Sequence, residues 1–285
     1  MTREQQGICY GALAAFLNSL IAILIKLSAT VPNETMVFIR FFIGFLILFP
    51  FYIRGKIKLT RIHFPKHLVR AVLGLCSIYF YYFALKRLPV ANAISFANTM
   101  PLFTPFVILI WLKLLVSKWK FISAGIGFLG VLLMLNPSQF TFEPASFSGL
   151  GTGLCAAIVF VGIRQLSKVE LIHVILFYYF SIATIISFFP CMYSWEPILE
   201  WKLWIYLICM GVLGMLFQFL LTLAFSMAPS SKAGLTVYLA VLFGGLWGWL
   251  IWGEVPTIVS SLGMGLIVLG GTMAMLDNTP SRELK

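Results

Sequence analysis

An arginine inside an apolar segment is the residue of this chain best suited to bind a charged ligand. Arg40 lies about one turn into the apolar run Met36–Ile53. At that depth in a bilayer, an arginine costs roughly 2.5–3.5 kcal/mol unless it faces water or a partner. We therefore expect its guanidinium to point into a helix bundle and to hold a carboxylate or phosphate with two donors. The alternative is that Arg40 snorkels to the outer headgroups from near the end of its helix.

Two prolines and neighbouring polar side chains mark a second candidate region, Ala91–Leu114. Pro101 and Pro105 each remove a helical backbone donor, and Asn98 and Thr99 stand just before them. Interrupted helices near the middle of the membrane are the best sequence indication of a carrier's binding site. We therefore expect Asn98 and Thr99 to line a cavity. The alternative is a kinked packing helix whose hydroxyls satisfy the freed carbonyls.

Four further polar or aromatic side chains within apolar segments are candidates to contact a small substrate. They are Tyr82, Tyr238, Asn18 and Gln218, and Tyr238 occupies the position that matches Asn98 in the second half of the chain. A tyrosine deep in a bundle can stack on a planar or cationic ligand. Tyrosines in membrane proteins more commonly lie at the lipid interface, and buried amides often only join helices. Both readings stay open for these four residues.

The apolar segments lack the groups that hydrolytic or metal chemistry needs. Such chemistry requires paired carboxylates, a histidine cluster or a Ser/His arrangement within reach, but these segments contain no aspartate, no interior glutamate and no central histidine. The 5 cysteines are scattered without a C-x-x-C spacing, which argues against a disulfide framework and a metal site. We therefore expect no catalytic residue, no metal and no cofactor, and we disfavour a membrane-embedded enzyme.

Composition places the whole chain in a membrane. The mean hydropathy is +1.00, with 61% hydrophobic and only 10% charged residues, and the apolar runs are long enough to span a bilayer. We predict an all-α integral membrane protein with ten transmembrane helices. Their ranges are Gly7–Leu27, Met36–Ile53, Leu68–Leu85, Ala91–Leu114, Phe121–Leu135, Gly149–Leu166, Ile172–Tyr193, Leu203–Phe225, Ala233–Trp252 and Thr257–Leu276.

The distribution of lysine and arginine predicts which side of the membrane each loop faces. An even number of spans puts both termini on one side, and basic residues in short loops mark the cytoplasm. A cytoplasmic N-terminus places 15 of the 20 basic residues in inner segments and four in outer ones, with Arg40 inside a span. This count assigns Arg70 to the basic loop after the second span, where we also expect His63 and His67 to be solvated. We predict a multi-pass protein of the cytoplasmic (inner) membrane with both termini cytoplasmic.

The formal net charge of +11 does not indicate a nucleic-acid partner. Topology selection and attraction to anionic headgroups both explain basic cytoplasmic loops. We expect membrane lipids and a small-molecule substrate as partners, no nucleic acid, and a monomer or homodimer.

The two halves of the chain are weakly similar and carry opposite charge bias. A shift of 140 residues aligns Gly74 with Gly214, Pro89 with Pro229, Gly125 with Gly265 and Gly130 with Gly270. The loop after the second span is strongly basic, whereas its counterpart after the seventh holds Glu196, Glu200 and a single Lys202. Equivalent loops then face opposite sides of the membrane. This pattern predicts two inverted five-helix repeats, residues 1–140 and 141–285, as in secondary transporters.

Several sequence runs carry a resemblance to a known family. They are Tyr82–Ala93, Pro101–Pro105, Gly125–Val131, and Gly253 and Glu254 followed by Gly263, Gly265, Gly270 and Gly271. With them the chain resembles EamA-type carriers of the drug/metabolite transporter superfamily over essentially its whole length. Its first half is similar to S-adenosylmethionine uptake carriers. The acidic residue that the family often has after the fourth span is absent, because Lys113 or Leu114 stands there.

The resemblance and the residues together predict a secondary transporter. It would move a small polar metabolite, an amino acid or an amino-acid-derived compound such as S-adenosylmethionine, by alternating access. Because Glu34 and Glu254 sit at helix ends and the spans hold no titratable acid, we expect facilitated transport or exchange. The alternatives are a proton-coupled exporter of amino acids or drugs and, from another class, a channel, which would not need two inverted copies around one site.

Overall fold

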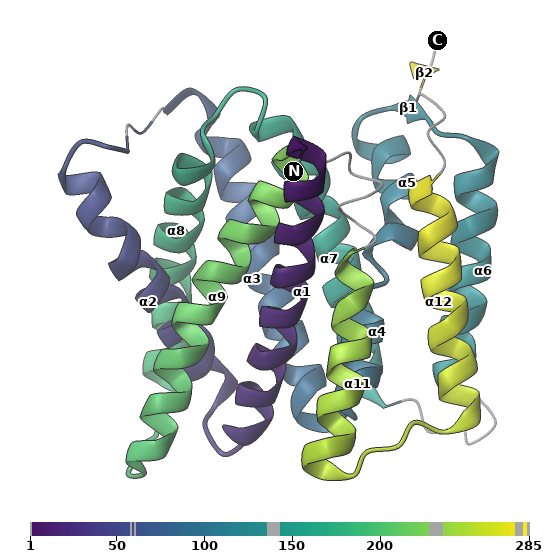
Figure 1. Cartoon of the computed structure of the whole chain (residues 1–285). Coiled ribbons are helices and arrows are strands. Elements are labelled where there is room, and N and C mark those ends of the chain that lie inside the picture. The colour runs from purple at the N-terminus through teal and green to yellow at the C-terminus, as the bar shows by residue number, and fades with distance from the viewer. Residues whose placement is uncertain are drawn as a thin grey trace.

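A computed structural model describes residues 2–57, 59, 61–135, 143–227, 236–276 and 282–283, which form a bundle of apolar helices (Figure 1). In this part of the chain, 8 helical segments are long and apolar enough to cross a membrane, and two shorter apolar segments accompany them. The first half contains α1 Arg3–Leu27, α2 Asn33–Ile53, η1 Arg61–His63, α3 Phe64–Arg87, α4 Val90–Ala97, α5 Met100–Trp111 and α6 Lys118–Leu135. The second half contains α7 Pro144–Leu166, α8 Ile172–Tyr193, α9 Trp201–Met227, η3 Thr236–Tyr238, α11 Leu239–Trp252 and α12 Ile258–Leu276.

The ten predicted spans correspond to these segments, with α4 and α5 together forming the fourth. The all-α membrane class is therefore confirmed. The predicted start of the ninth span at Ala233 lies outside the described residues. So do residues 136–142, which include the predicted boundary between the halves at residues 140 and 141.

The fourth segment is broken just before Pro101, whereas Pro105 lies inside α5. α4 ends at Ala97 and α5 begins at Met100, with Pro101 in its first turn. A proline fits the first turn of a helix because its missing N–H would have no partner there. Asn98 and Thr99 therefore lie at a helix break. The ninth segment also has an irregular described start, because the 3₁₀ turn η3 precedes α11.

Helices from the two halves of the chain pack against each other throughout the bundle. α6 packs on α12, α1 on α9, α3 on α7 and α2 on α8. In Figure 1, α6 and α12 stand side by side at one edge of the bundle, and α2 and α8 stand at the other. Contacts of α4 with α7 and of α11 with α1 close the centre. The interior is therefore enclosed by elements of both halves.

Glycines bring α6 and α12 into backbone contact. A side chain at Gly270 would meet Ser123 O and Gly127 N at 2.5 Å, and one at Gly130 would meet Gly263 O at 2.5 Å. Both distances are too short for any Cβ. Small residues at such positions let membrane helices approach closely and gain van der Waals packing. This face of the pair therefore has no room for a larger residue.

Both termini lie at the same end of the bundle (Figure 1). Arg282–Glu283 (β2) pairs antiparallel with Leu114–Leu115 (β1), which lies between α5 and α6. We refer to this as the terminal end. The opposite end, where α1 finishes at Leu27 and α11 at Trp252, is the distal end.

Two residues that we counted with the basic loop lie inside the bundle instead, although only His67 was expected to be solvated and the predicted third span, Leu68–Leu85, already contained Arg70. α3 begins at Phe64, so His67 and Arg70 belong to its first two turns. Their exposed fractions are 1% and 3%. The neighbouring basic residues made this stretch resemble a loop in sequence. Positions 67, 70 and 74 nevertheless share one helical face, and that face is buried.

Candidate functional site

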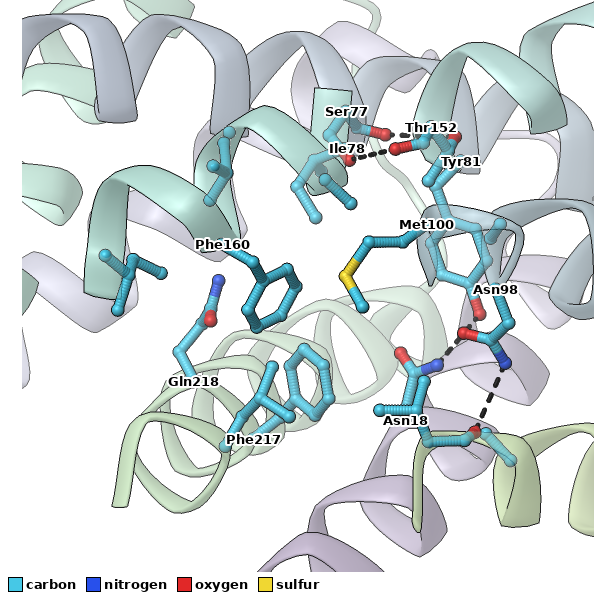
Figure 2. Close-up of a pocket in the computed structure, with 18 of the residues that line it drawn as sticks. Asn18, Ser77, Ile78, Tyr81, Asn98, Met100, Thr152, Phe160, Phe217 and Gln218 are labelled. Atoms are coloured by element: carbon cyan, nitrogen blue, oxygen red, sulfur yellow. Dashed lines mark hydrogen bonds between the residues drawn. The ribbon is translucent and has the colours of Figure 1, made fainter. Parts of the chain in front are cut away.

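A cavity of about 120 Å³ lies inside the bundle, between helices of both halves. Its walls are formed by α1, α3, α7 and α9 and by the two irregular segments around Asn98 and Val237. The α3 wall consists of Arg70, Gly74, Ser77, Ile78 and Tyr81. These residues follow helical spacing, so they form one face over about three turns. The facing walls include Phe160, Phe217 and Gln218 (Figure 2).

Two amide side chains in the cavity wall use their donors on the protein and keep their oxygens available. Asn18 Nδ2 donates to Tyr81 OH at 3.4 Å, and Asn98 Nδ2 donates to the backbone oxygen of Val237 at 3.2 Å. Both bonds are drawn in Figure 2. The second bond joins the α4/α5 break to η3, so the two irregular segments meet at the cavity. Asn98 thus lines a cavity as expected, and the candidates Asn18 and Gln218 line it too, while contact of the three with a substrate stays a prediction.

Two hydroxyls hold α3 and α7 together along the same wall. Ser77 Oγ donates to Thr152 O at 3.2 Å, and Thr152 Oγ1 donates to Ser77 O at 3.3 Å. Both bonds use backbone carbonyls of the partner helix, which is how polar side chains join membrane helices. The pair therefore fixes the spacing of the two walls beside the cavity.

A guanidinium lines the part of the cavity nearer the terminal end. Arg70 Cζ lies 3.7 Å from the centroid of the Tyr179 ring on α8, so the two side chains stack. The three guanidinium nitrogens of Arg70 have no hydrogen-bond partner among the described residues. Gly74, one turn further along α3, leaves the space that both groups occupy, since a side chain there would meet Arg70 Nη1 and Tyr179 Cε2 at 2.8 Å. The sequence reasoning missed this residue.

Arg40 points into the bundle but does not line the cavity. Its side chain is 2% exposed, and Nη1 donates to Tyr82 OH at 3.1 Å. Arg40 therefore does not snorkel to the headgroups, and its guanidinium faces the interior as expected. Neither Arg40 nor Tyr82 belongs to the cavity wall. A role for them in substrate binding stays a prediction.

Thr99 and Tyr238 do not line this central cavity. Thr99 is fully buried and its hydroxyl donates to Phe96 O at 2.6 Å, which is the behaviour that the packing alternative describes. Tyr238 packs against Gly271 of α12 and lines a second, mostly apolar cavity of about 660 Å³ beside α11 and α12. The structure therefore does not bring all seven predicted residues to one place.

A buried histidine lies one turn from Arg70. The His67 ring stacks on Tyr178 with 4.2 Å between ring centroids, and His67 Nε2 is 4.0 Å from Glu170 Oε1. The side-chain exposures of His67 and Glu170 are 0% and 6%. Two buried titratable groups thus lie together at the terminal end of the bundle, where Glu170 belongs to the connection between α7 and α8, although we expected His67 to be solvated.

An ion pair joins three elements at the distal end. Lys26, in the last turn of α1, pairs with Glu254, and the other carboxylate oxygen of Glu254 accepts the Val90 N–H at 2.8 Å. Gly253, with φ +65°, ends α11 in the left-handed conformation that glycine adopts without strain and so aims Glu254 at α4. We call Lys26, Glu254 and Val90 the distal latch.

Comparison with known proteins assigns this fold to a family. The sequence profile of the EamA-like transporter family matches residues 5–136 and again residues 144–276. The chain belongs to this family. As an EamA-like protein it is a multi-pass membrane transporter, and the predicted resemblance is confirmed.

Relatives of this EamA-like chain transport different compounds. The pseudopaline exporter CntI of Pseudomonas aeruginosa is 31% identical over 93% of this chain and 94% of its own length. An S-adenosylmethionine uptake transporter of Rickettsia prowazekii is 23% identical over 95% of this chain and 92% of its own length. One crystal structure matches with a TM-score of 0.64 at 21% identity, covering 96% of this chain and 98% of the other. That similarity supports the fold alone.

Proposed function

We propose that this EamA-like protein is a secondary transporter that moves a small polar metabolite by alternating access. The observation that carries the proposal is the cavity, which is enclosed by helices of both halves and holds amides beside the break between α4 and α5. Polar groups at interrupted helices between two repeats form the substrate sites of many carriers. The cavity is thus the expected place for substrate.

The packing of the helices supports the proposed inverted repeat, residues 1–140 and 141–285. If α1, α2 and α3 correspond to α7, α8 and α9, the contact of α1 with α9 becomes that of α7 with α3. The contact of α2 with α9 likewise becomes that of α8 with α3. The pairs α2 with α8 and α6 with α12 each map onto themselves. Such correspondence is expected of two repeats related by a two-fold axis.

The two ends of the bundle differ in the way that alternating access requires. The cavity residues Ala156–Ile163 and Phe217–Leu221 lie in the halves of α7 and α9 nearer the terminal end, and Thr152 lies near the middle of α7. The distal latch joins α1, α4 and the end of α11 at the other end. With both termini cytoplasmic, as the basic loops predict, this is a state that is closed toward the outside.

The cavity chemistry favours an amino acid or an amino-acid-derived cargo. Amide oxygens of Asn18 and Asn98 accept donors such as an ammonium group, and Phe160 and Phe217 contact apolar parts. One relative is named an exporter and another an uptake transporter. The direction of transport therefore depends on the cargo gradient in a carrier that works by facilitated transport or exchange.

Counterflow in liposomes tests the proposal. Proteoliposomes preloaded with an unlabelled amino acid or S-adenosylmethionine should accumulate the labelled compound transiently, and the flux should saturate. Asn98→Ala should lower this flux about tenfold because it removes a cavity amide, and the loss of thermal stability from the missing bond to Val237 O should be small by comparison. Leu129→Ala, on the exposed face of α6, is the matched control. Flux that neither saturates nor shows counterflow would indicate a channel.

A second candidate is proton-coupled transport, which the pair His67 and Glu170 favours. Titratable groups buried inside membrane bundles commonly serve proton relays, and these two lie 4.0 Å apart one turn from Arg70. In this case an imposed pH gradient should drive uphill flux, and His67→Gln should abolish the driven component while exchange persists. Equal response of wild type and His67→Gln to the gradient would exclude coupling through this pair.

A further inference from the structure

We propose that Arg70 binds a carboxylate of the transported compound, an inference that rests on the proposed transport function. The guanidinium of arginine stays charged in proteins, yet Arg70 is 3% exposed and no carboxylate of a described residue lies within 4.0 Å of it. A buried charge without a partner is unfavourable, and such charges in membrane bundles mark substrate pathways. A carboxylate in the cavity supplies the partner.

The surroundings of Arg70 hold its guanidinium ready for such an anion. Tyr179 covers one face of the group at 3.7 Å and is itself 2% exposed, packed edge-on against Phe41 with 5.1 Å between ring centroids. The ring restricts the guanidinium plane, and none of the guanidinium nitrogens makes a hydrogen bond of normal geometry to a described residue. Two parallel N–H···O bonds from these nitrogens to one carboxylate are therefore available.

The extent of the cavity indicates the shape of the compound. Its α3 wall runs from Arg70 to Tyr81, and at about 1.5 Å per residue these two positions are roughly 16 Å apart along the helix. The oxygens of Asn18 and Asn98 lie at the Tyr81 end, where they accept hydrogen bonds. The cargo we infer is therefore elongated, with a carboxylate at one end and an ammonium or other donor at the other.

The charge of the wall restricts the anion further. Arg70 is the one cationic side chain among the described residues that line this cavity. One guanidinium neutralises one carboxylate, whereas a nucleotide would bring several negative charges into the same low-dielectric space. The site therefore suits an amino acid with a long side chain, or a conjugate of an amino acid, better than a polyphosphate.

Pairs of compounds that differ only in the carboxylate test this inference. Purified protein is titrated with lysine and cadaverine, arginine and agmatine, and S-adenosylmethionine and its decarboxylated form, and the same compounds are used in counterflow. We expect wild type to bind the acid of at least one pair about thirtyfold more tightly than the matching amine. Arg70→Gln should remove this preference, and Arg70→Lys should restore only part of it. Arg164→Gln, which removes an exposed charge on α7, should keep it.

The outcomes separate this inference from the transport function. If wild type carries an acid and its amine equally well, or if Arg70→Gln keeps the preference, the role of Arg70 is overturned and the transporter stands. If wild type neither binds nor carries any compound of the set, the proposed cargo class falls, and the inference falls with it.

Thermal stability of the empty protein supplies a test that needs no ligand. If the guanidinium of Arg70 has no anionic partner in the empty protein, Arg70→Met removes an unpaired buried charge, so the melting temperature should stay equal or rise. Arg40→Met should lower it, because that change leaves the Tyr82 hydroxyl without its partner. A loss in Arg70→Met as large as that in Arg40→Met would show that Arg70 serves the fold, and would overturn the inference.

Discussion

At the scale of single residues, the buried charges of this bundle differ in where their partners come from. Arg40 donates to Tyr82, and Lys26 pairs with Glu254, so each has a partner within the protein. Arg70 has only the face of Tyr179 among the described residues. A missing partner costs a buried charge more free energy than an exposed one, because the low-dielectric interior does not solvate the charge. The difference separates charges that stabilise the fold from one suited to a substrate.

The interior position of Arg40 could be predicted from sequence, and that of Arg70 could not. Arg40 is flanked by apolar residues on both sides, so any helix that contains it must bury or snorkel its charge. Arg70 follows Lys66 and His67 closely and therefore resembles a loop residue. Its stacking partner Tyr179 belongs to another helix of the other half. Only the packing of α3 on α8 brings them together.

Arg40 offers a test at this scale. Arg40→Lys keeps the charge but loses the planar donor fork, so uptake should fall several-fold at normal expression, and Arg40→Ala should lose more. Tyr82→Phe, which removes only the hydroxyl, should destabilise the protein by about 1.5–3 kcal/mol, since that hydroxyl accepts from a charged donor. Uptake, expression and thermal stability are measured for each variant. Full uptake by Arg40→Lys would exclude a two-donor contact with substrate.

At the scale of helices and breaks, local chemistry predicted one irregular segment and not the other. Pro101 and Pro105 indicated the interruption that the structure places at Asn98 and Thr99. The 3₁₀ turn η3 contains no proline and was predicted to be part of a continuous helix. Its position is set by tertiary contacts, including the bond from Asn98 to Val237. Contacts of this kind depend on the whole fold and cannot be predicted from the neighbouring residues in the sequence.

The glycine contact between α6 and α12 gives a prediction about elements. Gly270→Leu would push its side chain into backbone atoms of α6 that lie 2.5 Å from a Cβ, so the helices must separate. We expect a loss of about 3 kcal/mol or more in stability, read as a lower melting temperature in detergent. Gly125→Leu is the matched control, because a Cβ there meets nothing within 4 Å. Similar melting temperatures for both variants would mean that the helices do not need this close approach.

At the scale of the whole molecule, the membrane class followed from composition and the interlocking of the halves did not. Long apolar runs make ten helical segments the natural reading of the sequence. Nothing in the sequence states that α1 packs on α9 or α3 on α7. Those pairings create the central cavity, so the site could be predicted only as separate residues. Asn18, Asn98 and Gln218 meet there, whereas Tyr238 faces a different cavity.

Orientation in the membrane is a second property of the whole chain. Basic loops predict that tags at both termini and in the loop Arg54–Lys66 are cytoplasmic, and that a tag within residues 138–146 is external. Protease protection or thiol labelling of tagged protein in intact cells checks each position. Both termini lie at one end of the bundle, so the tags at the two termini must be found on the same side of the membrane. An external tag in Arg54–Lys66 would reverse the predicted orientation.

The distal latch predicts how the molecule distributes between its two states. Glu254→Gln removes the ion pair to Lys26 and weakens the bond to the Val90 N–H. The side chains of Lys26 and Glu254 are 16% and 21% exposed, so we expect a change of about 1 kcal/mol, or roughly fivefold in the ratio of closed to open distal ends.

A cysteine placed at Ala156 in the cavity wall, in a background without the native cysteines, reports this ratio through labelling from the distal side. Labelling should rise in Glu254→Gln and not in Glu200→Gln, an exposed acid at the same end that has no ion pair with a described residue. Unchanged labelling in Glu254→Gln would mean that the latch only joins helices and does not bias the state.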